Sequence, residues 1–289
     1  MDILDAQIHM FYTLGLDETI AAMDALGIQS AVIDEFWDYT PDRKNGLPHA
    51  LLPGGVMRPV SPLAQAAALR FPERFSWLQR VERKDPDLAA VFAMLASSPG
   101  CRSIRIDTRE PAERESLLGG GHDMMMALAQ KHGLVVSVLS RETGTVMHGA
   151  LKRFPGVNFV LDHCGSPQSM AQWDEILALG TFGNCWLKWS HGHHFFEAGR
   201  FPYPGLQDQF ARAMDSFGKE RVMWASDFTH NRAGATWAEL LFYLREIPSL
   251  SEGDREWLFA RAARELFRWP APEVPASAPH FAKVARAKF

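Results

Sequence analysis

Residues 3–17 read ILDAQIHMFYTLGLD, and this opening stretch decides between the two folds that the rest of the chain allows. It begins as an apolar strand, and no GxGxxG loop follows, as one would in a dinucleotide-binding, doubly wound sheet. In an alternating strand, Asp5, Gln7 and His9 would point to one face. Three polar side chains on one face are costly unless that face opens onto a site.

After this strand, short runs rich in Val, Ile, Phe and Trp alternate with segments of helical period. We expect strands at 3–9, 30–36, 76–81, 102–107, 134–139, 157–162, 184–189 and 221–226, and helices near 17–27, 61–70, 86–97, 122–132, 144–153, 169–180, 206–217 and 235–246. Strands that alternate with helices, without an internal repeat, predict an α/β fold that closes into a (β/α)8 TIM barrel.

Residues 251–268 predict one more helix, which Ser251 caps and Pro270 ends. The remaining residues are rich in proline and alanine. We therefore expect a single catalytic barrel domain over residues 1–270 and a C-terminal tail over residues 271–289. A chain of 289 residues is long enough for one such barrel.

The composition narrows the class of protein. A net charge of −4 gives no reason to expect nucleic acid or an anionic membrane as a partner. Three cysteines without a CxxC pair indicate neither a disulfide framework nor a cysteine-based zinc site. No leader-like N-terminus and no apolar run of about 18 residues is present. We expect a cytoplasmic protein that acts on a small molecule, and a homo-oligomer stays open.

Polar residues gather where the predicted strands end, which is where a barrel carries its chemistry. They are Gln7, His9, Asp34, Glu35, Arg80, Arg105, Asp107, Ser140, Arg141, His163, Lys188, Ser190, His191 and Asp227. Stability alone does not explain so many polar groups at one rim, so we predict an enzyme. The long segment 38–57 is expected to be a structureless lid, with Trp37 beside it lining the pocket. Its basic residues, with Arg58, Arg80 and Arg105, indicate a carboxylated substrate, although solvated surface charge is an equal alternative.

Four segments resemble the amidohydrolase superfamily, in the branch of amidohydrolase-related proteins that includes lactonases of the 2-pyrone-4,6-dicarboxylate type and some decarboxylases. They are ILDAQIHM (3–10), VNFVLDHCGSP (157–167), NCWLKWSHG (184–192) and RVMWASDFTH (221–230). These are similar to the first, sixth, seventh and eighth strand segments of that family. Gln7 departs from the family pattern, because it stands where the first histidine of a His-x-His pair is usual. Strand five, VSVLSRE (136–142), also lacks the histidine or lysine of metal-bridged members.

The resemblance implies hydrolysis of a lactone, in which Asp227 is the general base and His9 and His163 polarise the carbonyl. We expect a small carboxylated substrate to contact Gln7, Arg105, Arg80, Lys188, Ser190, His191 and Trp37. We expect no metal, because the lactonase branch runs without one. The alternative is a single zinc or manganese ion held by His9, His163 and Asp227. Alternative functions are a metal-dependent decarboxylase of an aromatic or unsaturated carboxylate, and a non-catalytic barrel.

Several of these residues also have a purely structural interpretation. Asp227 could cap a helix or a turn, and His163 could be a hydrogen-bonded core histidine. Lys188 is expected first of all as a buried ion-pair partner. Arg105 needs a carboxylate if it faces inward, and Asp107 of the same strand or a substrate acid could supply it. The histidines of the loop that follows strand seven, His191 among them, are expected to face solvent for the most part.

Overall fold

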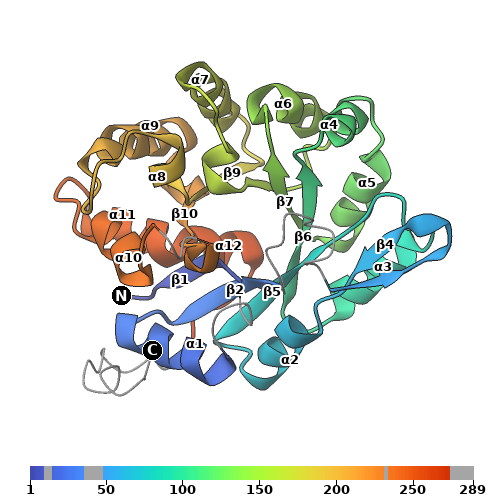
Figure 1. Cartoon of the computed structure of the whole chain (residues 1–289), viewed down its shortest axis with the longest axis horizontal. Coiled ribbons are helices and arrows are strands. Elements are labelled where there is room, and N and C mark those ends of the chain that lie inside the picture. Colours follow the sequence, from blue (N-terminus) through green and yellow to red (C-terminus); the bar gives the residue numbers. More distant parts are fainter. Residues whose placement is uncertain (10–14, 36–47, 231–233, 274–289) are drawn as a thin grey trace.

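Eight strands form one parallel sheet in the computed structural model, which describes residues 1–9, 15–35, 48–230 and 234–273. The sheet order is β1 (Leu4–Ile8), β2 (Ser30–Asp34), β5 (Phe75–Arg80), β6 (Cys101–Thr108), β7 (Val135–Ser140), β8 (Phe159–Leu161), β9 (Cys185–Trp189) and β10 (Val222–Trp224). Every neighbouring pair in this order is parallel. Figure 1 shows the helices around the strands, so the predicted TIM barrel is confirmed.

The helices that surround the barrel follow the expected rhythm, with two additions. They are α1 (Leu16–Leu26), α2 (Pro62–Arg70), α3 (Leu88–Ser97), α4 (Pro111–Leu118), α5 (Asp123–His132), α6 (Thr143–Arg153), α7 (Met170–Ala178), α8 (Gly192–Phe195), α9 (Gln207–Phe217) and α10 (Trp237–Arg245). The sequence did not predict α4 and α8. Each buries a single residue, Leu117 and Gly192 respectively, so neither has the apolar stripe that reveals a helix. None of the helices in the described ranges is long and apolar enough to cross a membrane.

The expectation of a structureless segment over 38–57 is wrong for the part that the structure describes. Residues 36–47, which include Trp37, lie outside the described residues. The remainder forms an antiparallel hairpin of β3 (His49–Leu51) and β4 (Met57–Pro59). Gly54, with φ of 80°, lies in the turn, where a left-handed backbone favours glycine. Arg58 fastens the hairpin to the loop after β5, because its Nε donates to Asp85 at 2.6 Å.

The extra C-terminal helix packs under the barrel. Its parts are α11 (Glu252–Glu256), a π-helical turn (Trp257–Arg261) and α12 (Ala262–Phe267). Leu266, Phe267 and Trp269 belong to the same apolar cluster as the inward-facing strand residues, Leu4 and Val160 among them. A second apolar cluster joins the outer faces of the strands to the surrounding helices. The C-terminal helix therefore supplies the apolar floor of the barrel, on the side away from the strand ends.

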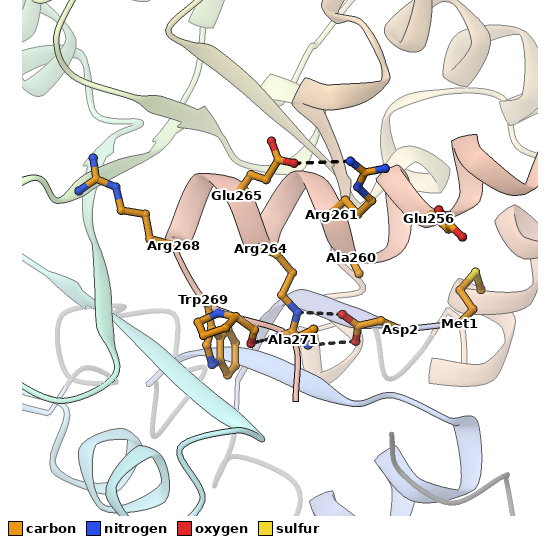
Figure 2. Close-up of a pocket in the computed structure, with 11 residues that line it drawn as sticks. Met1, Asp2, Glu256, Ala260, Arg261, Arg264, Glu265, Arg268, Trp269 and Ala271 are labelled. Carbon is orange, nitrogen blue, oxygen red and sulfur yellow. Dashed lines mark hydrogen bonds and ion pairs between the residues drawn. The ribbon is translucent and has the colours of Figure 1, made fainter. Parts of the chain in front are cut away.

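Figure 2 shows how the N-terminal residues Met1 and Asp2 meet the C-terminal helix at this floor. Arg264 of α12 donates to both carboxylate oxygens of Asp2, at 2.9 and 3.0 Å. The ring of Trp269 lies 5.0 Å from the Arg264 guanidinium and 5.4 Å from that of Arg102. A hollow of about 530 Å³ lies beside these groups, and none of the predicted site residues lines it. This end of the barrel therefore has a structural role. Residues 274–289 of the predicted tail lie outside the described residues.

The carboxylate of Asp5 helps to close the barrel between its first and last strands. Asp227 N donates to Gln7 O across this seam at 2.9 Å. Asp5 Oδ1 accepts from Ser226 N at 2.9 Å and from Gln7 N at 3.1 Å, while Oδ2 accepts from Trp237 Nε1 at 2.8 Å. Because β10 has only three residues, this side chain supplies acceptors that a longer strand ladder would provide.

The expectation that Asp5 shares a face with Gln7 and His9 is wrong. The pairing of β1 with β2 shifts register between Asp5 and Ile8, and such an irregularity breaks the alternation of faces. Asp5 therefore reaches Trp237 of α10, outside the barrel, whereas Gln7 reaches Lys188 inside it.

The buried carboxyl group of Asp5 should make the stability of the fold depend on pH. Burial raises the pKa of Asp5 from 3.8 to about 6, so the folded state holds a proton that the unfolded chain has released between these values. Asp5 therefore stabilises the fold least at high pH, and its contribution is lost as pH rises through about 6. The free energy of unfolding of wild type relative to Asp5→Asn should fall by about 2 kcal/mol between pH 4 and pH 7. Urea unfolding at several pH values measures it, and a pH-independent difference would contradict the assigned shift.

Candidate active site

A row of alternating charges crosses the barrel interior just below the strand ends. Arg80 of β5 makes a bidentate pair with Asp34 of β2, at 3.0 and 2.7 Å. Arg105 of β6 donates to the same Asp34 and, through Nε, to Asp162 at 2.7 Å. Lys188 of β9 follows, with its Nζ 2.9 Å from Asp162 Oδ1. The row thus ties five strands together in a region where unpaired charge is very costly.

Gln7 of β1 ends this row as a neutral acceptor. Its Oε1 accepts from Lys188 Nζ at 3.0 Å, and both side chains are fully buried. Its Nε2 has no hydrogen-bond partner among the described residues. Gln7 therefore satisfies the ammonium group of Lys188 from below and does not line the pocket.

The row fixes the ionisation of two of its members, Arg105 and Asp34. Burial opposes charge on Arg105, but Asp162 and Asp34 outweigh it and raise the pKa of the guanidinium. Burial likewise favours a neutral Asp34, yet Arg80 and Arg105 hold the pKa of its carboxyl below the usual range. These groups are charged at all ordinary pH values, so the interior of the barrel presents a fixed electrostatic field to the site above it.

Asp227 lies above the row, among three imidazoles. Its Oδ1 is 3.0 Å from His9 Nε2, and its Oδ2 is 2.7 Å from His191 Nε2 and 3.6 Å from His163 Nε2. Burial alone would raise the pKa of this carboxyl, but His9 and His191 hold it well below its usual range. Asp227 is therefore an anion at neutral pH, which a general base or a metal ligand requires.

The imidazoles around Asp227 differ in charge. Burial lowers the pKa of His9, but the negative charge of Asp227 outweighs burial and raises it. The other ring nitrogen of His9, Nδ1, lies 2.6 Å from the backbone oxygen of Asp34, which fixes the ring. Burial and the neighbouring His191 lower the pKa of His163 well below its ordinary value, so this ring is neutral. Ser190 Oγ, 2.9 Å from His163 Nδ1, orients it.

The backbone is strained at these residues. His163, His191 and Asp227 have φ values of 53°, 56° and 45°, in the left-handed region that non-glycine residues rarely occupy. Such a conformation costs about 1–3 kcal/mol for each residue, and it persists only where the surrounding structure enforces it. Asp227 carries a carboxylate that the other two residues face. Strained residues gathered around one group are typical of a functional site.

A pocket of about 380 Å³ opens above Asp227. Its lining is His9, Arg80, Arg105, Arg109, Leu139, Ser140, Arg141, His163, Ser166, Gln168, His191, His194, Phe195 and Asp227. Asp227 is the single carboxylate among these described residues, against four arginines. The pocket therefore favours a substrate with negative charge.

The structure brings together most of the predicted site residues, but not all of them. His9, His163, Asp227, Arg80, Arg105 and His191 line the pocket. His191 is buried, so the expectation that it faces solvent is wrong; its loop turns inward through α8. Lys188 and Gln7 lie beneath the pocket, and Ser190 lies behind His163. Asp107 is exposed and pairs with Arg109, so it is not the partner of Arg105.

Sequence reasoning missed several residues that line the pocket. Arg109 and Gln168 come from loops, and His194 and Phe195 come from the short helix α8; the strand-end rule reaches none of them. Asp162 was missed as well, although it directly precedes His163 at the end of β8. The signal for Asp162 was available, because two predicted inward cations, Arg105 and Lys188, each needed a carboxylate.

A compact group of three side chains could hold a divalent metal ion. The ligand atoms of His163, His191 and Asp227 all lie within 4.8 Å of one another. This set differs by one member from the predicted one, because His191 takes the place of His9. Two imidazoles and a carboxylate suit zinc, and the donor chemistry therefore fits a single ion. Arg105 Nη2 lies 3.3 Å from His163 Nε2, so a metal ion would compete with Arg105 for that nitrogen.

The fold and the site define the chain as an enzyme of the TIM-barrel class with a carboxylate and three imidazoles gathered at its strand ends. The amidohydrolase family model matches residues 13–269, so the chain belongs to the amidohydrolase family. A search of curated proteins finds no match.

Three solved structures are similar to this chain in fold. A provisional 2-pyrone-4,6-dicarboxylic acid hydrolase from Pseudomonas putida is 18% identical with a TM-score of 0.71, over 93% of this chain and 98% of that one. A zinc-bound amidohydrolase from Burkholderia multivorans is 17% identical with a TM-score of 0.73, over 93% and 100%. A 5-carboxyvanillate decarboxylase from Novosphingobium aromaticivorans, complexed with manganese and 4-hydroxy-3-methoxy-5-nitrobenzoic acid, is 15% identical with a TM-score of 0.62, over 89% and 81%. At these identities the likeness establishes the fold alone.

The charge row predicts which carboxylates stabilise the protein. Asp162→Asn should lower the free energy of unfolding by about 3–5 kcal/mol, because Arg105 and Lys188 would each lose a buried anion. Asp107→Asn, which removes an exposed carboxylate from β6, is the matched control and should cost about 1 kcal/mol or less. Chemical denaturation of both variants measures the difference. Equal effects would show that the row is not held by its ion pairs.

Proposed function

We propose that the chain hydrolyses a lactone of a small carboxylated substrate, with Asp227 as the general base. The observation that carries the proposal is the ionised Asp227, which shares a single pocket with four arginines. An ester bond supplies a carbonyl for water to attack, and substrate carboxylates supply the charge that the arginines complement. The name of the Pseudomonas putida structural neighbour supports the same reaction class.

In the proposed reaction, Asp227 takes a proton from water while the water oxygen attacks the lactone carbonyl. A carboxylate with a depressed pKa is a weak base in the resting site, so proton transfer accompanies the attack. The Arg105 guanidinium, which lies at the pocket wall, stabilises the negative charge that develops on the carbonyl oxygen. The ring C–O bond then breaks, and the proton held by Asp227 passes to the leaving oxygen, which gives a hydroxy acid.

His9 and His163 have different parts in this proposal. Both ring nitrogens of His9 have protein partners, Asp34 O and Asp227, so His9 orients the base. His163 is neutral and lies at the pocket, and its ring nitrogens already meet Ser190 Oγ and Arg105 Nη2, so its part is to orient Arg105 toward the carbonyl. A divalent ion at His163, His191 and Asp227 would, when bound, lower the pKa of a bound water. Because Arg105 already donates to His163, we propose that hydrolysis does not require the ion.

Decarboxylation is the second candidate, and the compact His163, His191 and Asp227 group favours it. The manganese-bound decarboxylase among the structural neighbours points to the same chemistry. The two reactions differ in their dependence on metal and in their products, so one assay separates them.

The function is tested with 2-pyrone-4,6-dicarboxylate and 5-carboxyvanillate, each with a chelator and with added zinc or manganese. We expect hydrolysis of the lactone in the presence of chelator, which is measured as a loss of pyrone absorbance. We expect no release of carbon dioxide. Asp227→Asn should lower kcat/KM by about 10²–10⁴-fold, because the general base is lost. Asp107→Asn is the control. Decarboxylation that needs manganese would favour the second candidate, and a fully active Asp227→Asn enzyme would exclude Asp227 as the base.

Arg141 is expected to bind a carboxylate of the substrate. It follows β7 and lines the pocket, and its guanidinium makes no hydrogen bond or ion pair with the described residues. Arg141→Gln should raise KM about tenfold or more with kcat nearly unchanged, because a charge-assisted hydrogen bond contributes about 1.5–3 kcal/mol. Arg70→Gln, at the far end of α2, is the control. Steady-state kinetics give the answer; a fall in kcat at constant KM would place Arg141 in the chemistry and not in binding.

A further inference from the structure

We propose that Asp5 is a positioning residue that sets the place of Asp227 in the site. The inference rests on the proposed role of Asp227 as the base. Asp227 stands three residues beyond the short strand β10 and has a left-handed backbone with φ of 45°. A strand ladder does not hold a residue in that conformation, so other contacts must fix it.

Asp5 contacts the residue before Asp227 directly, and it reaches the residue after Asp227 through Ser226 and Trp237. On one side, its Oδ1 accepts from Ser226 N at 2.9 Å. On the other side, Phe228 N donates to Ser226 Oγ at 3.2 Å, and the Phe228 ring stacks on Trp237 with centroids 4.2 Å apart. Trp237 in turn donates from Nε1 to Asp5 Oδ2 at 2.8 Å. One carboxylate therefore holds the whole Ser226–Phe228 turn that presents Asp227.

The chemistry of the contacts requires a carboxylate. Asp5 is fully buried, and its two oxygens accept N–H groups from Ser226, Gln7 and Trp237. Only an ionised carboxyl offers two acceptor oxygens and no donor. An asparagine at this position would point its NH2 group either at the backbone amides or at the Trp237 indole N–H. In either case one edge of the turn loses its acceptor and meets a second donor.

The test compares Asp5→Asn with Asp2→Asn, measured at pH 7.5 where both proteins are folded by near-UV circular dichroism. Asp2 lies three residues earlier and pairs with Arg264 at the barrel floor, so it is a matched Asp-to-Asn change outside the site. We expect Asp5→Asn to lower kcat on 2-pyrone-4,6-dicarboxylate about tenfold or more with KM within about twofold, because a shift of ~1 Å in a catalytic group can cost ~10²-fold. Asp2→Asn should keep kcat. A folded Asp5→Asn enzyme with wild-type kcat would overturn the proposal.

Crystal structures of both variants provide a readout that does not depend on activity. The separation of 2.7 Å between His191 Nε2 and Asp227 Oδ2 should lengthen in Asp5→Asn and persist in Asp2→Asn. An unchanged separation in Asp5→Asn would overturn the positioning role even if the substrate proposed above is wrong. Conversely, wild type could be inactive on 2-pyrone-4,6-dicarboxylate while Asp227 is displaced in the Asp5→Asn structure. That pair of results would contradict the proposed function and support the positioning role.

Trp237→Phe separates positioning from folding. It keeps the carboxylate and an aromatic ring for Phe228, but removes the donor to Asp5 Oδ2. Combined with Asp5→Asn, it leaves room for the asparagine NH2 group, so the double variant should recover part of the kcat that Asp5→Asn loses. A double variant no better than Asp5→Asn would contradict the proposed contacts. If Asp5→Asn does not fold, Trp237→Phe alone should lower kcat about threefold at constant KM, and full activity would overturn the proposal.

Discussion

Two carboxylates inside the barrel, Asp34 and Asp162, are the constraint on which the rest of the site depends. Each lies between two cations that come from other strands, so together they tie five strands into one buried row. A buried ion pair adds little net stability, but removal of one partner leaves a charge that the interior cannot solvate. The barrel therefore tolerates its polar upper layer only as a complete set, with an apolar floor beneath it.

The row also explains the electrostatics of the pocket. Three cations alternate with two carboxylates, which leaves one positive charge in excess below Asp227. Further arginines at the pocket wall extend this field to the substrate space. This surplus attracts an anionic substrate, whereas His9 and His191 keep Asp227 ionised. Substrate recognition and the charge of the proposed base therefore depend on different neighbours within one pocket.

Rigid strands position the reacting groups, but the groups themselves lie in strained turns just beyond them. His163, His191 and Asp227 each have a left-handed backbone, and each follows a different strand. Parallel strands bring these turns to one end of the barrel, and packing holds them there. The carboxylate of Asp5 extends this support to the last turn, where the strand is too short to provide it.

The sequence alone is enough to predict the barrel and most of its rim, because apolar periodicity predicts strands and parallel strands present their ends together. It placed His9, His163 and Asp227 at one mouth, and the amidohydrolase family assignment is confirmed. The pairing of charges follows from the folded barrel and not from the sequence. Arg105 pairs with Asp34 and Asp162 of distant segments, and not with Asp107 of its own strand. A register shift also turns Asp5 away from the face of Gln7. Local patterns specify which way a side chain points, but partners across a barrel depend on stagger and on loops, which no local pattern encodes.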